Sequence, residues 1–168
     1  MSRRLEMQTG FTLMELVVVL VIISVLAALI MPRFIDAQTE ARIVKIKTLH
    51  GTLRSAAALA KSRCELDIVA GYSSVSCTSV GGQVDMEGVR VIMSNRYPTA
   101  DAEGILAAAA IDPAADGVTI LNNGGSAPGS SVVLGVSGAP RPESCRVGYT
   151  APVAAGTAPV LEIDISGC

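Results

Sequence analysis

A carboxylate near the start of an uncharged apolar run is the residue best placed to do chemistry in this chain. Glu15 ends the stretch Gly10-Phe11-Thr12-Leu13-Met14-Glu15, and the next charged residue is Arg33. A helix over residues 11–32 rises about 33 Å, which is enough to cross the hydrocarbon core of a bilayer. An ionised side chain in such a segment costs about 3 kcal/mol on insertion scales. We therefore expect Glu15 to have a positively charged partner.

A cut at the Gly10–Phe11 junction would supply that partner. Residues 1–10 are short and polar, and Arg3 and Arg4 favour a cytoplasmic location for them, with the C-terminal bulk across the membrane. An ordinary secretory signal is cut after its apolar run, whereas this junction precedes the run. Cleavage here would keep the anchor and free an amine at Phe11, one helical turn from Glu15. The two charges can neutralise each other within one chain or between neighbouring chains.

These residues and the apolar run after them resemble the processing site of type IV prepilins and the related pseudopilins. The resemblance implies that a prepilin peptidase cuts between Gly10 and Phe11 and that the new Phe11 amine is methylated. It also implies that Glu15 pairs with the Phe11 amine of an adjacent subunit during filament assembly.

The helix that carries Glu15 is predicted to continue into a small head. After Pro32, apolar residues recur at three- and four-residue steps as far as Ser62–Cys64, which predicts an amphipathic half. Apolar segments bounded by turn residues predict an antiparallel meander, with strands over 117–121, 132–136, 145–149 and 160–165. These patterns predict an α+β fold with one long helix on a sheet of about four strands, and the resemblance implies that it is a pilin fold. The organisation is a leader (1–10), an apolar helix (11–32), its amphipathic half (33–63) and a globular head (64–168).

Two segments between the helix and these strands have weaker patterns. Residues 65–98 hold scattered Gly, Ser and Thr, which predicts a long connection with at most one short strand over 89–93. Residues 100–111 predict a short helix with Thr99 as a candidate N-cap. The order of Tyr97-Pro98 and this Ala-rich helix is similar to that in pilins of the mannose-sensitive haemagglutinin (MSHA) type.

Four cysteines follow the apolar helix, on the side of the membrane where disulfides persist: Cys64, Cys77, Cys145 and Cys168. Three pairings are possible, and sequence proximity favours Cys64 with Cys77 and Cys145 with Cys168, each worth about 3 kcal/mol in the chain-entropy model. A C-terminal disulfide around a surface loop is common in pilins, and Cys145–Cys168 resembles one. Because the chain lacks a Cys-x-x-Cys pair and has His50 as its single histidine, we expect no metal and no cofactor.

Other polar groups have ordinary interpretations. Residues 123–126 (Asn-Gly-Gly-Ser) lack the Gly-Lys-Ser/Thr ending of a phosphate loop and predict a hairpin turn. Asp112 and Asp116 offer oxygens to calcium, but a solvated turn is favoured. His50 lies inside the long helix, which favours a partly exposed side chain over a catalytic base. A basic set on the same helix predicts a solvated face or a filament contact, with DNA or lipid headgroups as alternatives: Arg42, Lys45, Lys47 and Arg54.

Composition and charge narrow the function classes. The 168 residues are 50% hydrophobic but 3% aromatic, and much of the apolar excess lies in the first helix, so the core of the head should be modest. The net charge is -2, and -3 once Arg3, Arg4 and Glu6 leave with residues 1–10, which leaves no strong nucleic-acid footprint. No catalytic constellation emerges, so we expect no enzyme.

The resemblance implies a structural subunit of a type IV pilus that serves surface attachment in a Gram-negative bacterium. The subunit would be a single-pass inner-membrane protein with a periplasmic C-terminus, and extracellular after assembly. Its implied partners are further copies in a homo-oligomeric filament, the prepilin peptidase, an assembly ATPase with its inner-membrane platform, an outer-membrane secretin, and a host or environmental surface ligand. A pseudopilin of a type II secretion system shares the motif, although two disulfides and a long connection favour a pilin. A membrane-anchored periplasmic enzyme or binding protein is the third class.

Overall fold

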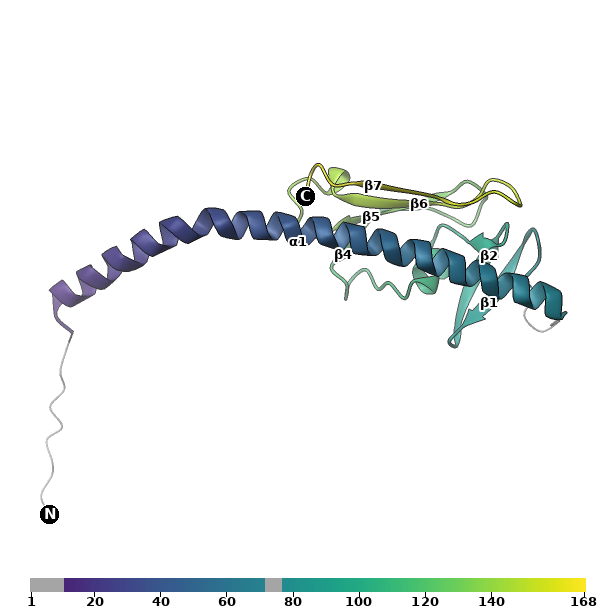
Figure 1. Cartoon of the computed structure of the whole chain (residues 1–168), viewed down its shortest axis with the longest axis horizontal. Helices are drawn as coiled ribbons and strands as arrows, with labels where there is room; N and C mark the ends of the chain where they lie inside the picture. The colour runs from purple at the N-terminus through teal and green to yellow at the C-terminus, as the bar shows by residue number, and fades with distance from the viewer. Residues whose placement is uncertain (1–10, 72–76) are drawn as a thin grey trace, which may run out of the picture. The chain divides into compact units, whose positions relative to one another are not determined.

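The computed structural model describes residues 11–71 and 77–168. Its longest element is helix α1 (Leu13–Ala70), which is 58 residues long and contains Pro32 (Figure 1). The chain divides into two compact units, Met1–Thr39 and Glu40–Cys168, and α1 contributes to both.

The first unit consists of the N-terminal half of α1. Every side chain from Phe11 to Gln38 is exposed. The most apolar 18-residue window of this helix has a mean hydropathy of 3.0, and none of it is buried, so its length and composition would allow it to cross a membrane. An uncovered apolar surface of this size marks a contact with lipid or with other apolar chains.

In the second unit, one face of α1 packs on the head. The buried residues recur at three- and four-residue steps, as predicted: Ile46, Leu49, Leu53, Ala56, Ala57, Ala60, Cys64 and Asp67. The helix continues to Ala70, past the end predicted at Ser62–Cys64. The inward face holds beyond Cys64 because Asp67, a polar residue, takes the next inward position and pairs with Arg63 at 3.3 Å.

The predicted meander of four antiparallel strands is confirmed. Its order is β4-β5-β6-β7. The strands are β4 (Val118–Asn123), β5 (Ser131–Val136), β6 (Arg146–Thr150) and β7 (Val160–Asp164). Inward residues of the middle strands, such as Leu134, Val147 and Tyr149, form one core with α1. The predicted turn at residues 123–126 lies in the connection between β4 and β5, where Gly124 has a φ of +62°.

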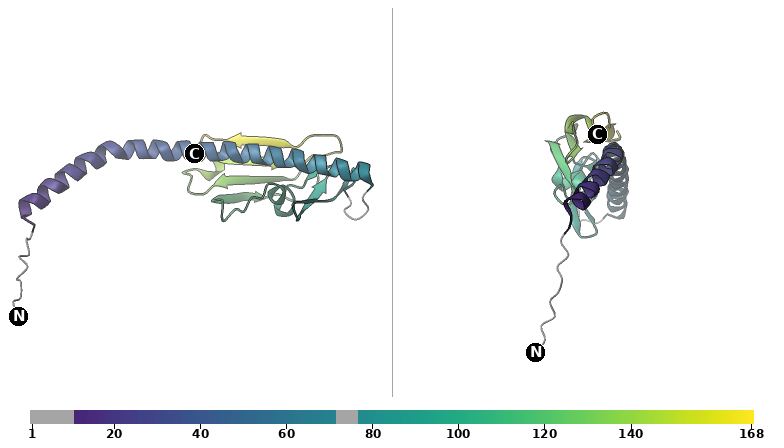
Figure 2. Two further views of the ribbon diagram at one scale, coloured as in Figure 1. Left: turned by 60° about the horizontal axis from the view of Figure 1, so that its bottom comes forward. Right: turned by 90° about the vertical axis from the view of Figure 1, so that its left-hand side faces the viewer.

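The short strand predicted over 89–93 is confirmed, but the prediction that the rest of 65–98 is a long irregular connection is wrong. This region contains a second antiparallel sheet of β1 (Gly81–Met86), β2 (Val89–Ser94) and β3 (Tyr97–Pro98). Gly81 and Gly82 belong to strand β1 and not to a loop. Glu87 and Gly88, both with positive φ, form the two-residue turn of the hairpin between β1 and β2. Both sheets lie on one side of α1 (Figure 2).

The short helix predicted over 100–111 is a π-helical turn, η1 (Ala102–Leu106), and its cap is Asp101 instead of Thr99. One oxygen of Asp101 accepts hydrogen bonds from the Gly104 amide and the Thr99 hydroxyl, each at 2.8 Å. Gly104 is required here because a Cβ atom at this position would overlap the backbone of Thr99. A short 3-10 turn, η2 (Pro142–Ser144), precedes β6.

Candidate functional site: the start of the long helix

The start of α1 is built around Thr12 and Glu15. The Thr12 hydroxyl accepts a hydrogen bond from the Glu15 amide at 3.3 Å, and the Thr12 carbonyl accepts from Leu16 at 3.2 Å. Thr12 is therefore the N-cap of α1, and Glu15 is its third helical residue. A Thr followed three residues later by Glu is the capping-box pattern, a local sequence signal that marks this helix start.

This position gives the Glu15 carboxylate a local role as well as any role in assembly. It lies in the first turn, where the helix dipole favours a negative charge. Its side chain is exposed, as is Phe11, which is 77% exposed. The structure thus brings Phe11 and Glu15 to the same end of the helix, while Gly10 and the rest of the predicted leader lie outside the described residues.

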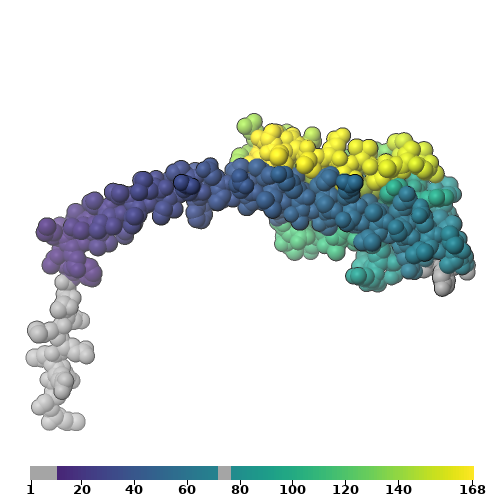
Figure 3. Space-filling model, viewed as in Figure 1, coloured from purple at the N-terminus to yellow at the C-terminus, as the bar shows by residue number. Residues whose placement is uncertain are grey.

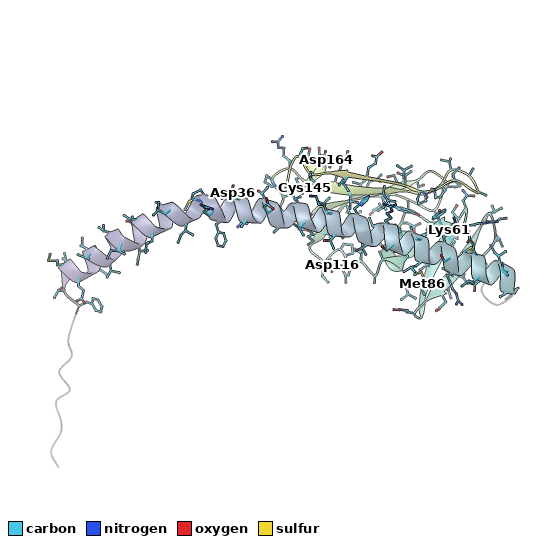
Figure 4. The ribbon with its side chains drawn as sticks, in the orientation of Figure 1. Asp36, Lys61, Met86, Asp116, Cys145 and Asp164 are labelled. Atoms are coloured by element: carbon cyan, nitrogen blue, oxygen red, sulfur yellow. A yellow bond between two sulfur atoms is a disulfide. The ribbon has the colours of Figure 1, made fainter. Side chains whose placement is uncertain are left out.

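The cysteines form the two disulfides that sequence proximity favours. Cys64 in α1 is bonded to Cys77, with Cα atoms 5.3 Å apart, and Cys145 is bonded to Cys168, with Cα atoms 4.8 Å apart. The first disulfide ties the end of α1 to the segment before β1. The second, whose Cys145 is labelled in Figure 4, holds the residues after β7 beside those before β6.

The basic set on α1 does not act as one surface. Arg42 donates a hydrogen bond to the oxygen of Cys168 at 3.0 Å, and the Lys45 ammonium donates to the carbonyls of Asp116 and Gly117. These two side chains attach the helix to the head, a role that sequence reasoning missed because their acceptors are backbone groups far along the chain. Lys47 and Arg54 are exposed.

Asp112 and Asp116, for which the sequence favours a turn over a calcium site, are used within their own loop. Asp112 accepts from the amides of Ala114 and Ala115 at 2.9 and 3.3 Å, and Asp116 accepts from the Asp112 amide at 3.0 Å. Within residues 11–71 and 77–168 there is no group of three His, Cys, Asp or Glu side chains that could hold a metal ion.

Two titratable groups in the head are perturbed. Burial raises the pKa of Tyr149 above its ordinary value of 10.0, with a smaller contribution from Tyr97. The backbone amide and the hydroxyl of Ser166 lower the pKa of Asp164 by donating hydrogen bonds to its carboxylate. Both groups belong to the second unit, Glu40–Cys168.

Comparison with known proteins agrees with the site at the helix start. Residues 7–31 match the prokaryotic N-terminal methylation motif, and this match includes Gly10, Phe11 and Glu15. The chain is also similar to the type IV narrow pilus major component PilA5 of Thermus thermophilus, with 43% identity over 51 residues, or 30% of this chain and 44% of that protein. The chain is therefore similar to a type IV pilin over this segment, which spans less than half of that relative's length. No solved structure matches it significantly.

Proposed function

We propose that the chain is a structural subunit of a type IV pilus and has no catalytic role. The observation that carries this proposal is an apolar helix, exposed from Phe11 to Gln38, that starts within a methylation motif. Residues 1–10 are the leader, 11–32 the helix of the membrane and filament core, 33–63 its amphipathic half and 64–168 the head. On assembly, the apolar helices exchange contact with lipid for contact with each other.

The Glu15 carboxylate sets the axial register of the filament in this proposal. A prepilin peptidase cuts between Gly10 and Phe11, and the Phe11 amine is methylated. This amine keeps its positive charge and pairs with Glu15 of an adjacent subunit. A subunit docked at the wrong axial step would leave Glu15 unpaired among apolar helices, where an isolated charge is costly.

The capping geometry provides a test that separates pairing from helix stability. Gln replaces Glu in capping boxes, so Glu15→Gln removes the charge and keeps the side chain that suits the third helical position. Thr12→Ala removes the cap and keeps the charge. We expect Glu15→Gln to reduce the yield of sheared filaments strongly and Thr12→Ala to reduce it less, while mass spectrometry shows normal cleavage in both. Wild-type yield from Glu15→Gln would refute the ion pair.

The proposed locations and partners follow from the same mechanism. Before assembly, the protein is anchored in the inner membrane of a Gram-negative bacterium with its head in the periplasm. After assembly by an ATPase, an inner-membrane platform and a secretin, the heads form the outer surface of a filament that attaches to a host or environmental surface. The MSHA subtype remains a sequence-based prediction.

The intact mass of subunits in sheared filaments tests this placement. A chain that starts at methylated Phe11 and is four hydrogens lighter than its reduced form is expected, because both disulfides are present in the structure. A processed chain found in membranes and absent from every sheared filament would instead indicate a pseudopilin of a type II secretion system.

A further inference from the structure

A groove of about 560 Å³ runs along one flank of α1 in the head, between the helix and the residues that lead into β7. Its hollow shape has a simple cause, because α1 presents Ala57 and Ala58 there and the facing segment presents Ala158 and Pro159. The volume is within the range of small-molecule sites in proteins. Polar and charged side chains line its walls: His50, Arg54, Lys61, Ser62 and Glu65. Figure 3 shows the C-terminal segment, in yellow, along α1.

The cations of this groove differ in how fully they are paired. Lys61, labelled in Figure 4, lies 3.7 Å from a Glu65 oxygen and 5.2 Å from the centre of the Tyr97 ring. Arg54 has no carboxylate within 4.0 Å among the described residues, and its side chain is exposed. Arg54 therefore presents a free guanidinium, with a fork of donors that matches a carboxylate, at the edge of a concave surface.

The rest of the lining contains both hydrogen-bonding and apolar groups. His50 can donate and accept, and Glu65 accepts. The Ser62 hydroxyl donates its hydrogen to the Ala58 carbonyl at 3.0 Å and can accept from a ligand. Tyr97, Pro159 and Leu161 supply apolar surface. An acidic sugar has the matching set of groups, because it carries one carboxylate, several hydroxyls that donate and accept, and an apolar ring face. An acidic peptide offers carboxylates without the hydroxyls or the ring face.

We propose that this groove binds an acidic sugar unit of a polysaccharide, with the sugar carboxylate on Arg54 and the sugar ring against the Tyr97 side of the groove. Lys61 adds positive charge, and Glu65, Ser62 and His50 bind hydroxyls. All residues of this groove lie within Glu40–Cys168, so it shares no residue with the site at the helix start.

The test is calorimetric titration of the full chain in detergent micelles with oligogalacturonate at physiological ionic strength. The methyl ester of oligogalacturonate is the control ligand, because it has the same rings and hydroxyls without the negative charge. We expect the acid to bind and the ester to bind at least about tenfold more weakly, since a charge-assisted bidentate pair is lost.

Two variants localise the binding. Arg54→Gln should weaken oligogalacturonate about tenfold or more, while Lys47→Gln, an exposed cation of the same helix outside the groove, should change it less than about twofold. Equal weakening by the two variants would reduce the binding to general charge attraction and overturn the proposal. It is also overturned if the wild type does not bind the acid, if the ester binds as well, or if oligoglutamate of equal length binds as tightly.

Discussion

Removal of one hydroxyl in the core of the head should measure how the two sheets are joined. Tyr149 in β6 is fully buried, and its hydroxyl donates a hydrogen bond of 2.8 Å to the carbonyl of Pro98 in β3. Tyr149→Phe keeps the ring and leaves this carbonyl without that donor. A buried group that loses its partner costs about 1 to 2 kcal/mol, so we expect the urea midpoint of the head to fall by about 0.5 to 1 M.

The assay is urea unfolding of the full chain in detergent, monitored by the circular dichroism signal of the β-strands. Tyr97→Phe is the matched control, because Tyr97 is partly exposed and its hydroxyl makes no hydrogen bond to the described residues, so its loss should cost less than about 0.5 kcal/mol. A Tyr149→Phe variant as stable as the wild type, or a Tyr97→Phe variant destabilised to the same extent, would refute the reasoning.

The wild type and Tyr149→Phe should also differ in how their stability changes at alkaline pH. Because the pKa of Tyr149 is raised above 10.0 in the folded state, the unfolded state loses this proton first. The contribution of the neutral phenol is therefore complete below about pH 10 and is lost as the pH rises further. Between neutral pH and about pH 11 the wild type should lose more stability than Tyr149→Phe, because all other titrating groups are common to both.

Four further changes test other features of the head and its helix. Gly51→Ala should stabilise α1 by about 1 kcal/mol in urea unfolding, because nothing lies within 4 Å of the added Cβ, whereas Gly104→Ala should destabilise the head by more than that, because its Cβ overlaps Thr99. Replacing Cys145 and Cys168 together with Ala should cost about 3 kcal/mol, and a reductant should then act on the remaining disulfide alone. Asp164→Asn should flatten the acid dependence of stability, because a lowered carboxylate pKa stabilises the fold above the unfolded value and this contribution disappears as the pH falls through the folded value.

The elements that were predicted from sequence have strong local periodicity. Leu53, Ala57, Ala60 and Cys64 recur at helical steps, and Leu161 and Ile163 alternate with acidic residues in β7, so the pattern itself identifies these elements. The sheet over 81–98 was missed because Gly81, Gly82 and Gly88 dominate a window in which few side chains alternate. Its Val84 and Val91 face each other in register across β1 and β2 and are both fully buried, a relation that exists only after the hairpin forms.

The functional residues likewise include some that the sequence could predict and some that it could not. The prepilin motif is contiguous in sequence, and local chemistry around Glu15 was enough to find it. The roles of Arg42 and Lys45 were not accessible, because their acceptors are backbone oxygens 126 residues and 71 to 72 residues away. Backbone acceptors leave no residue-type signal, so a charge pattern alone predicted a solvated face.

These contacts together explain how a head with a modest core stays fixed to the C-terminal half of α1. Arg42 holds the oxygen of Cys168, whose disulfide continues to the fully buried Cys145. The neighbouring Gly167 accepts a backbone hydrogen bond from Arg141 and donates one to Ser144 at 2.8 Å. A pull on α1 is therefore passed to the segment before β6 by a covalent bond and by hydrogen bonds that act in parallel. At Lys45 the acceptors are backbone carbonyls, which do not titrate, so this attachment of helix to head should persist over the acidic and neutral range in which a carboxylate partner would weaken.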